Sequence, residues 1–403
     1  MAQKIALMIL ASGIGIPAAF FTIALPGMMR DGGASLMQVG LVYLVWLPSV
    51  VKVLWAPLVE RFAVSYRSRR RIISLTTLVM GLGFLPVSWL AVEMAVGWLL
   101  ALAVLSAALG LTLQLVIAGW CMSSLDEAAR GRANGLIAAG MVLGGILGGG
   151  AVPSLAGIFG WLPVVCTLSV FIALTGLAGR FLQTGASVPV ADQVRLRDAL
   201  RIFAGTKGGL LLGAVALIAS TGAVDMTLAA RLVDAGLSPE RAAFVLGTFA
   251  TILMVPATLL AGQAISRWHP ARCFAAVCMV KAVVLFALAF LPQASVHVIA
   301  GLAVAEFICA GALTVLTWQF YMSRPDRGAE ISGFAILTSV DALFRLGFGI
   351  AAGALGTVIG MSALFGGVAG LNLIAACFLL MIWQKVRRQD QHPPIDEFAL
   401  RQG

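Results

Sequence analysis

Long apolar runs separated by short charged gaps are the feature that most constrains how this chain of 403 residues can fold. A helix needs roughly 20 mostly apolar residues to cross a hydrocarbon core of about 30 Å. We predict twelve such helices, over residues 5–29, 37–59, 72–92, 97–121, 134–158, 161–180, 208–231, 242–265, 273–292, 295–321, 331–357 and 362–385. With 61% hydrophobic and 11% charged residues, the chain has too little polar surface for a water-soluble protein of this length. The sequence therefore predicts an all-α polytopic membrane protein.

The basic residues lie mostly in alternate gaps between the apolar runs. Loops on the cytoplasmic side of a membrane protein carry an excess of Lys and Arg. If both termini are cytoplasmic, the inside segments hold most of the 27 basic residues, and the outside segments hold only Arg30, Arg231 and Arg241. We therefore predict a multi-pass protein of the bacterial inner (plasma) membrane with both termini in the cytoplasm. This orientation explains the net charge of +10 without a nucleic-acid partner.

The chain also repeats itself over half its length. The segment "MSSLDEAARGRANG" at 122–135, after the fourth helix, has a counterpart in "MSRPDRGAEISG" at 322–333, after the tenth. Between the two halves lies the longest hydrophilic stretch. Two related six-helix halves joined by a linker are typical of secondary transporters. The predicted organisation is an N-terminal half over 1–182, a cytoplasmic linker over 183–207, a C-terminal half over 208–386 and a cytoplasmic tail over 387–403.

This architecture resembles the major facilitator superfamily over the whole chain. The loop after the second helix of that superfamily typically reads G-x-x-x-D-R-x-G-R-R, and here Glu60 and Arg61 stand at the Asp-Arg positions, followed by the basic run Arg69–Arg71. Both glycines of the pattern are missing. The stretch from Ala24 to Arg61, which includes "KVLWAPLVER", is similar to the K-F-L-W-A-P-L-V-D-R region of muropeptide permeases (AmpG type). It is more closely similar to permeases that import iron-siderophore complexes (RhtX/FptX type).

The resemblance implies a gating role for the end of the second helix. In this superfamily the acidic residue there and the following arginine form a charge relay that holds one conformation closed on the cytoplasmic side. We expect Glu60 and Arg61 to form this relay, with Lys52 as a third candidate gating residue. The alternative is that Glu60 and Arg61 only anchor the helix end among lipid headgroups.

Six charged residues fall inside the predicted membrane helices. Each costs roughly 2.5 to 3.5 kcal/mol on insertion scales, so such residues usually face a bundle interior or a water-filled cavity. Asp341 and Arg345 are spaced for a pair on one helix face, as a structural or a functional salt bridge. The resemblance implies that helices one, four, seven and ten line the central cavity, which favours Asp225 and Glu306 as site residues. The six residues are Lys52, Asp225, Lys281, Glu306, Asp341 and Arg345.

Glu306 is the first candidate for proton coupling and Asp225 the second. A carboxyl group in a low-dielectric cavity is easier to protonate than one in water, and so can load and release a proton. The alternative is a permanent ion pair with Lys281 or Arg345 that only holds helices together. Polar and aromatic residues on helices four and ten are candidate contacts for an aromatic, amphipathic substrate. They are Gln114, Trp120, Trp318 and Gln319.

Three transport functions remain open at this point. The first is proton-coupled import of a siderophore or its iron complex, and the second is import of a muropeptide or other cell-wall fragment. The third is proton-driven drug efflux, because the glycines of 140–149 resemble the G-x-x-x-G-P-x-x-G-G pattern of proton antiporters, with Gly145 in place of the proline. The same glycines also fit close packing between helices.

The sequence favours a transporter over an enzyme. No nucleophile stands beside a base, and no nucleotide-binding loop occurs in a soluble domain. The six cysteines and three histidines show no metal-ligand spacing. We therefore predict no cofactor and no metal, and as partners a small siderophore-like amphipathic substrate, protons and the lipid bilayer.

Overall fold

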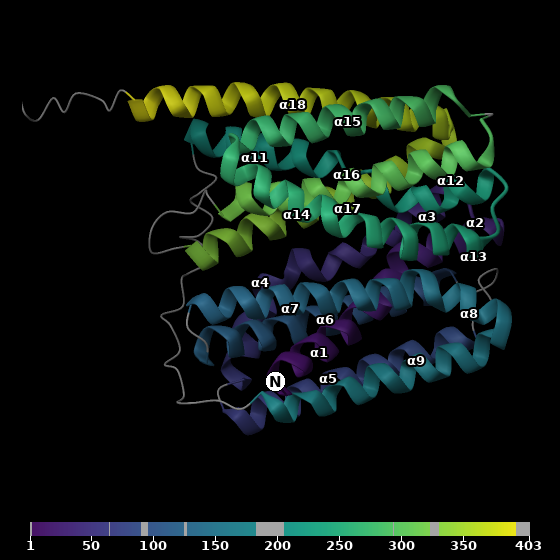
Figure 1. Ribbon diagram of the computed structural model, residues 1–403, viewed down its shortest axis with the longest axis vertical. Helices are drawn as coiled ribbons and strands as arrows, with labels where there is room; N and C mark the ends of the chain where they lie inside the picture. The colour runs from purple at the N-terminus through teal and green to yellow at the C-terminus, as the bar shows by residue number, and fades with distance from the viewer. Residues whose placement is uncertain are drawn as a thin grey trace, which may run out of the picture.

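The computed structural model describes residues 2–63, 65–89, 96–124, 127–182, 205–292, 294–322 and 330–391. Within these ranges every regular element is a helix, and the elements form two bundles (Figure 1). The predicted linker over 183–207 falls largely outside the described residues, as do most of the predicted tail and most of the second repeated segment.

The N-terminal bundle, purple to blue-green in Figure 1, contains the first six spans. Several spans are assembled from two or three consecutive helical pieces. These elements are α1 (Ala2–Ala19), η1 (Phe20–Ala24), α2 (Leu25–Asp31), α3 (Leu36–Gly40), η2 (Leu41–Trp46), α4 (Leu47–Phe62), α5 (Tyr66–Phe84), η3 (Leu85–Ser88), α6 (Val96–Ser124), α7 (Glu127–Gly145), η4 (Ile146–Ala151), α8 (Val152–Phe159), α9 (Trp161–Thr175) and η5 (Gly176–Phe181).

The C-terminal bundle, green to yellow in Figure 1, contains the other six spans. Its elements are α11 (Gly205–Ser220), η7 (Asp225–Thr227), α12 (Leu228–Asp234), α13 (Pro239–Ala243), η8 (Phe244–Ala250), α14 (Thr251–Arg267), α15 (Pro270–Phe290), α16 (Val296–Met322), α17 (Glu330–Ile359) and α18 (Met361–Gln391).

The predicted all-α architecture of membrane-spanning length is confirmed. Among the described residues, eleven helices are long and apolar enough to cross a membrane. The remaining predicted span is the continuous run of α3, η2 and α4, whose apolar part, Leu36–Lys52, is shorter.

Several helix boundaries differ from the sequence prediction, among them those of the third and the last helix. The third helix begins at Tyr66 rather than at residue 72, because Ser65 and Ser68 form a capping box at its start. The arginines at 67 and 69–71 therefore lie in the first turns of α5 and not in a loop. The last helix continues to Gln391 rather than ending at residue 385.

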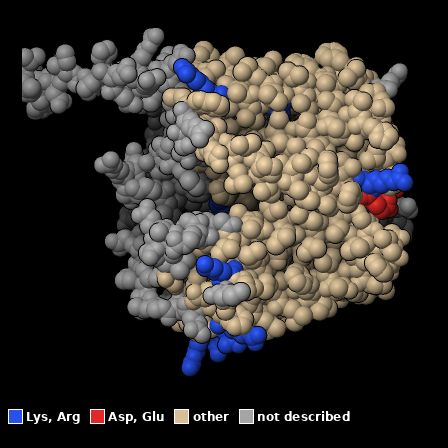
Figure 2. All heavy atoms as spheres, in the orientation of Figure 1, with Lys and Arg blue, Asp and Glu red and all other residues tan. Residues whose placement is uncertain are grey.

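Most charged side chains on the surface of the described residues lie at the two ends of the molecule. Figure 2 shows a broad uncharged surface between an end rich in Lys and Arg and an end with one small mixed patch. We call the first the arginine-rich end, after Arg67, Arg70 and Arg71, and the second the opposite end. Large apolar side chains such as Phe290 and Val358 are exposed on the described surface, as expected for a protein that faces lipid.

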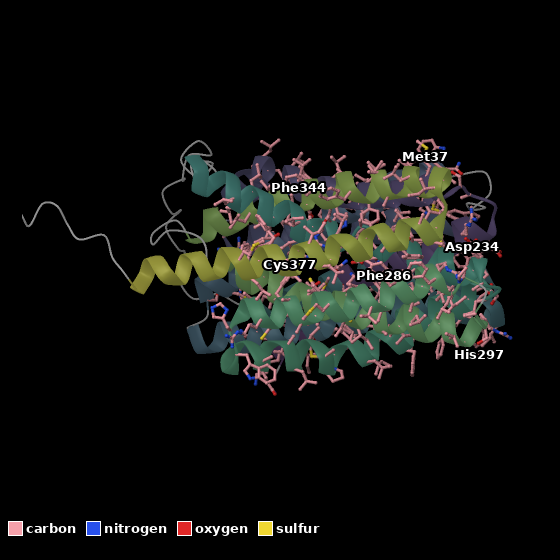
Figure 3. All side chains as sticks on the ribbon, turned by 90° about the horizontal axis from the view of Figure 1, so that it is seen from above. Met37, Asp234, Phe286, His297, Phe344 and Cys377 are labelled. Atoms are coloured by element: carbon pink, nitrogen blue, oxygen red, sulfur yellow. The ribbon has the colours of Figure 1, made fainter. Side chains whose placement is uncertain are left out.

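The two bundles meet at the opposite end, at mid-height and along α4, which runs toward the arginine-rich end. At the opposite end and mid-height α2 contacts α12 and α13, α8 contacts α13, η4 contacts η8, and α17 contacts α3 and η2; α17 also contacts α4. Asp234 of one bundle and Met37 of the other lie at the opposite end (Figure 3). An ion pair of 2.6 Å between Arg30 Nε and Asp234 Oδ1 joins the bundles here. The opposite end is therefore closed.

Glycines permit two close crossings between the bundles. A Cβ built on Gly40 would lie 2.7 Å from Gly353 Cα, so α3 and α17 touch backbone to backbone. A Cβ built on Gly247 would overlap the backbone of Gly149, which gives η8 and η4 the same kind of contact. Small residues let membrane helices approach this closely.

Replacing Gly247 with alanine is expected to separate the bundles at the opposite end, because the new methyl group has no space against Gly149. The measurement is the rate of disulfide crosslinking between cysteines placed at Arg30 and Asp234, which form the cross-bundle ion pair. We expect the Gly247→Ala change to lower this rate several-fold. The matched control is Gly262→Ala, since nothing lies within 4 Å of a Cβ at Gly262. Equal crosslinking in both variants would contradict the proposed role of this contact.

The glycine run of the fifth span has a packing function. Cβ atoms at Gly140, Gly144 and Gly148 would each collide with a backbone carbonyl oxygen of α1. These glycines are spaced by four residues and so lie on one face of α7 and η4. Their carbonyl neighbours are those of Met8, Ser12 and Ile16. Close packing of helices explains this part of the sequence.

Candidate functional site

The seventh span is broken near the middle of its length, where the sequence predicted a continuous helix over 208–231. After α11, backbone hydrogen bonds change to three-residue spacing, from Thr221 N to Ile218 O (3.2 Å) and from Asp225 N to Gly222 O (3.2 Å). Broken helices often carry the binding site of a transporter, because they place backbone polar groups and side chains at the centre of the fold. Asp225 lies in this break.

Tyr43 of the other bundle forms hydrogen bonds to the backbone groups that the break leaves unpaired. Its hydroxyl donates a hydrogen bond of 2.7 Å to Gly222 O and accepts one of 3.3 Å from Met226 N. In a regular helix Met226 N would bond to Gly222 O directly, so the hydroxyl is inserted into one helical hydrogen bond. The ring of Tyr43 packs against Gly349, where any side chain would overlap it. Tyr43 therefore links η2, the break and α17 at mid-height.

Three of the predicted charges meet beside the break. Lys281 Nζ lies 2.8 Å from Asp225 Oδ1 and 2.9 Å from Glu306 Oε1, so one ammonium group is shared by two carboxylates. The side chains of Lys281 and Glu306 are 1% and 0% exposed, whereas that of Asp225 is 29% exposed. We call Asp225, Lys281 and Glu306 the Lys281 triad. Within the triad, Asp225 is the member whose side chain has exposed surface.

A second group of polar side chains lies between the second and eleventh spans. Arg345 Nε donates to Asp341 Oδ2 at 2.8 Å, and Tyr321 donates to Asp341 Oδ1 at 2.9 Å. Lys52 Nζ donates to Thr338 Oγ1 at 2.9 Å. The Arg345 guanidinium lies 5.7 Å from the centre of the Trp46 ring, at cation–π distance. We call Trp46, Lys52, Thr338, Asp341 and Arg345 the α4–α17 cluster.

The triad and the cluster are neighbours. A Cβ built on Gly222 would lie 2.9 Å from both Arg345 Nη1 and Asp225 Oδ2, so the two charged groups flank the same glycine. Asp225 thus faces Lys281 with one oxygen and the side of Arg345 with the other. Charged groups from both bundles form one connected network across the middle of the molecule.

The structure brings together six of the predicted site residues and leaves four elsewhere or undescribed. The expected pair of Asp341 with Arg345 is present, and both Asp225 and Glu306 contact Lys281. Gln114 is exposed on α6 and has no hydrogen bond to the network among the described contacts. For Glu60, Arg61 and Gln319 the structure describes the backbone only, so their predicted roles lie outside the described side chains. Lys52 contacts α17.

Sequence reasoning missed the two buried tyrosines. The chain has only three tyrosines, and two of them, Tyr43 and Tyr321, lie within apolar spans and bond to the network. A buried tyrosine hydroxyl needs a hydrogen-bond partner, so this placement was a usable signal. Gly222, which lies within the break, was a second usable signal.

We expect Tyr43→Phe to lower the thermal stability of the purified protein, because it leaves the Gly222 carbonyl and the Met226 amide without their shared partner. An unsatisfied buried polar group costs about 1 to 3 kcal/mol. The control is Tyr66→Phe, which removes an exposed hydrogen bond to Arg180 O at the arginine-rich end. If both variants unfold at the same temperature, Tyr43 does not stabilise the break.

Two bundles of membrane-spanning helices, with a charged network buried where they meet, define this protein as a membrane transporter of the two-halved class. The sequence model of the Major Facilitator Superfamily matches residues 5–341, and the chain belongs to this superfamily. It is therefore a multi-pass secondary transporter of a small molecule and not an enzyme.

Solved structures with the same fold include transporters for different substrates. A bacterial homologue of the human lysosomal transporter Spinster, in an inward-facing, unoccupied conformation, is 16% identical, with 94% of this chain and 96% of that chain covered and a TM-score of 0.69. The nucleoside transporter NupG is 14% identical, with 95% and 99% covered and a TM-score of 0.70. A D-xylose-proton symporter is 13% identical, with 94% and 96% covered and a TM-score of 0.70. At these identities the similarity shows the fold alone.

Proposed function

We propose that this protein is a proton-coupled importer that carries a siderophore or its iron complex across the bacterial inner membrane by alternating access. The observation that carries the proposal is the Lys281 triad, in which one buried cation is shared by two carboxylates. In this proposal both termini and the arginine-rich end face the cytoplasm. The linker over 183–207, also cytoplasmic, joins an N-terminal half over 1–182 to a C-terminal half over 208–386.

The triad has two carboxylates and one ammonium group, and this excess of negative charge favours binding of a mobile cation. With all three groups ionised the triad itself carries one negative charge in the membrane interior, where a charge is costly unless a neighbouring group offsets it. A proton on one carboxylate removes this charge. Glu306 is fully buried, and neither of its carboxyl oxygens has a well-formed hydrogen bond within the described part of the chain. We assign the transported proton to Glu306.

Asp225 supplies the route by which this proton enters and leaves. Its side chain is the exposed member of the triad, and its carboxylate contacts the same Lys281 ammonium group as Glu306 does. A proton from water can reach Asp225 first and then pass to the buried carboxylate. The break in the seventh span places Asp225 at this position.

The closed opposite end supports an alternating-access cycle. In this conformation the described contacts between the bundles lie at the opposite end, at mid-height and between α4 and α17. Rocking of the two halves about the central network would open the opposite end and close the arginine-rich one.

The proposed substrate class rests on the resemblance of the segment Ala24–Arg61 to siderophore permeases. A muropeptide is the second candidate, because the same segment also resembles muropeptide permeases. Drug efflux has less support, since the glycines at 140–149 that suggested it have a packing explanation against α1 and η8.

Uptake of radioiron-labelled siderophores into membrane vesicles tests this proposal. Right-side-out and inverted vesicles containing the protein are compared, with and without a proton gradient. We expect inward accumulation of one chelate that collapses when a protonophore is added. Accumulation of a labelled muropeptide instead would change the substrate and leave the proton coupling intact. Extrusion of a lipophilic dye without uptake of any chelate would contradict the importer.

A further inference from the structure

The buried charges divide into two groups of opposite sign. The Lys281 triad has two carboxylates and one cation, so its formal charge is one negative when all groups are ionised. The α4–α17 cluster has two cations, Lys52 and Arg345, and one carboxylate, Asp341, so its formal charge is one positive. The two groups adjoin at Gly222, where they compensate each other.

Proton binding to the triad removes the negative charge that offsets the positive charge of the α4–α17 cluster. Once Glu306 is protonated the triad is neutral, while the cluster keeps its positive charge. A net charge buried at low dielectric attracts a counter-ion strongly. In the protonated protein, one bound anion would therefore neutralise the positive charge of the cluster.

Lys52 is the cation available to an anion. Arg345 is engaged by Asp341 at 2.8 Å, whereas the hydrogen-bond partner of Lys52 among the described residues is the neutral hydroxyl of Thr338. Lys52 is half-buried, and Asp341 acts on it electrostatically without contacting it within ion-pair distance. An ammonium group in this setting retains donors for a carboxylate of a ligand.

Trp46 supplies a second recognition element. Its indole Nε1 is buried and has no hydrogen-bond partner among the described groups, and its ring lies under the Arg345 guanidinium. A buried indole N–H without a partner costs free energy, and a ligand oxygen would satisfy it. Its aromatic surface also suits a planar ring in the ligand.

We propose that the α4–α17 cluster is the binding site for the carboxylate of an aromatic organic acid, and that this anion and the transported proton bind cooperatively. The proposal rests on the proton-coupled function proposed above and names the charge of its substrate. Lys52 binds the carboxylate and Trp46 contacts its ring, so Lys52 is a binding residue in place of the gating residue that the sequence suggested.

The groups around Glu306 identify the residue that couples the proton site to the anion site. Lys281 of α15, Asp225 of η7 and Tyr43 of η2 interact electrostatically with Glu306, and Cys309 lies on its own helix. Of these, Asp225 flanks Gly222 together with Arg345 of the cluster, and Tyr43 also interacts electrostatically with Arg345. Asp225 is the ionisable acid of the two that lies beside Lys281, and through it a proton on Glu306 changes the field at the anion site.

Binding of 2,3-dihydroxybenzoate and its neutral analogue 2,3-dihydroxybenzamide to the purified full chain tests this proposal, because the two probes differ in charge and share the same ring. We expect the acid to bind at least about tenfold more tightly than the amide, since pairing of a partly buried charge contributes strongly to affinity. We expect Lys52→Gln to remove this preference and Lys4→Gln, an exposed control at the start of α1, to leave it unchanged. Equal affinity for the two probes, or no binding of the acid at millimolar concentration, would overturn the proposed anion site.

The pH dependence separates this proposal from the proposed proton coupling. We expect the acid to bind more tightly at mildly acidic than at mildly alkaline pH in the wild type. We expect Glu306→Gln to bind it tightly at both pH values, because the triad is then always neutral. A Lys52-dependent preference with no pH effect would overturn cooperativity and the proton role of Glu306 but leave the anion site standing. A pH effect on probe binding that persists in Glu306→Gln would overturn the cooperativity through Glu306.

Discussion

Replacing Lys281 with methionine is expected to destabilise the protein by about 3 to 5 kcal/mol, the usual cost of removing one partner from a buried ion pair. The side chain is 1% exposed and its ammonium group lies within 3 Å of two carboxylates. Without it, Asp225 and Glu306 repel each other in the membrane interior. Methionine has a similar length, so lost packing contributes little.

The expected loss is measured as the thermal unfolding temperature of the detergent-purified protein. The control is Lys4→Met, because Lys4 is exposed at the start of α1. Adding Glu306→Gln to Lys281→Met is expected to recover much of the stability, since the remaining carboxylate, Asp225, is 29% exposed and reaches water. If the double variant is no more stable than Lys281→Met alone, the two carboxylates do not depend on one shared cation.

Replacing Glu306 with glutamine is expected to abolish accumulation driven by a proton gradient and to preserve exchange of substrate across the membrane. Glutamine has nearly the same shape and can still accept a hydrogen bond from Lys281, but it neither binds nor releases a proton. The variant resembles the permanently protonated state, in which the substrate-loaded halves still rock. Coupling is lost because the net movement of a proton no longer accompanies the substrate.

The two activities are measured on the same proteoliposomes, as gradient-driven accumulation and as counterflow of labelled against unlabelled substrate. The control is Glu240→Gln, which neutralises an exposed glutamate of α13 at the opposite end. We expect the control to retain both activities. Normal accumulation in Glu306→Gln would remove this residue from the coupling mechanism.

The rarity of charges inside apolar helices allowed most of the network to be predicted from the sequence. Lys52, Asp225 and Lys281 stand out because a charged side chain in a membrane helix needs a specific environment. The spacing of Asp341 and Arg345 also predicted their contact, because residues four apart on a helix are neighbours. Local rules were sufficient for these residues.

Relations between helices were not accessible in the same way. The sharing of Lys281 by two carboxylates depends on how the seventh, ninth and tenth spans pack, and no pattern within one helix encodes this. The contact of Lys52 with Thr338 joins the two halves of the chain, so the gating interpretation based on Glu60 could not anticipate it. The break at Gly222 is stabilised by a hydroxyl group from 179 residues away in the sequence. Such contacts depend on tertiary packing, so patterns within one helix do not predict them.

An infrared titration of the purified protein tests the central claim most directly, because it detects the proton itself and needs no knowledge of the substrate. Difference spectra are recorded between mildly acidic and mildly alkaline pH for the wild type, Glu306→Gln and Glu240→Gln. We predict a band from a protonated, buried carboxylic acid that disappears on alkalinisation in the wild type and in Glu240→Gln and is absent from Glu306→Gln. The same titrating band in Glu306→Gln, or none in the wild type, would contradict the assignment of the transported proton to Glu306.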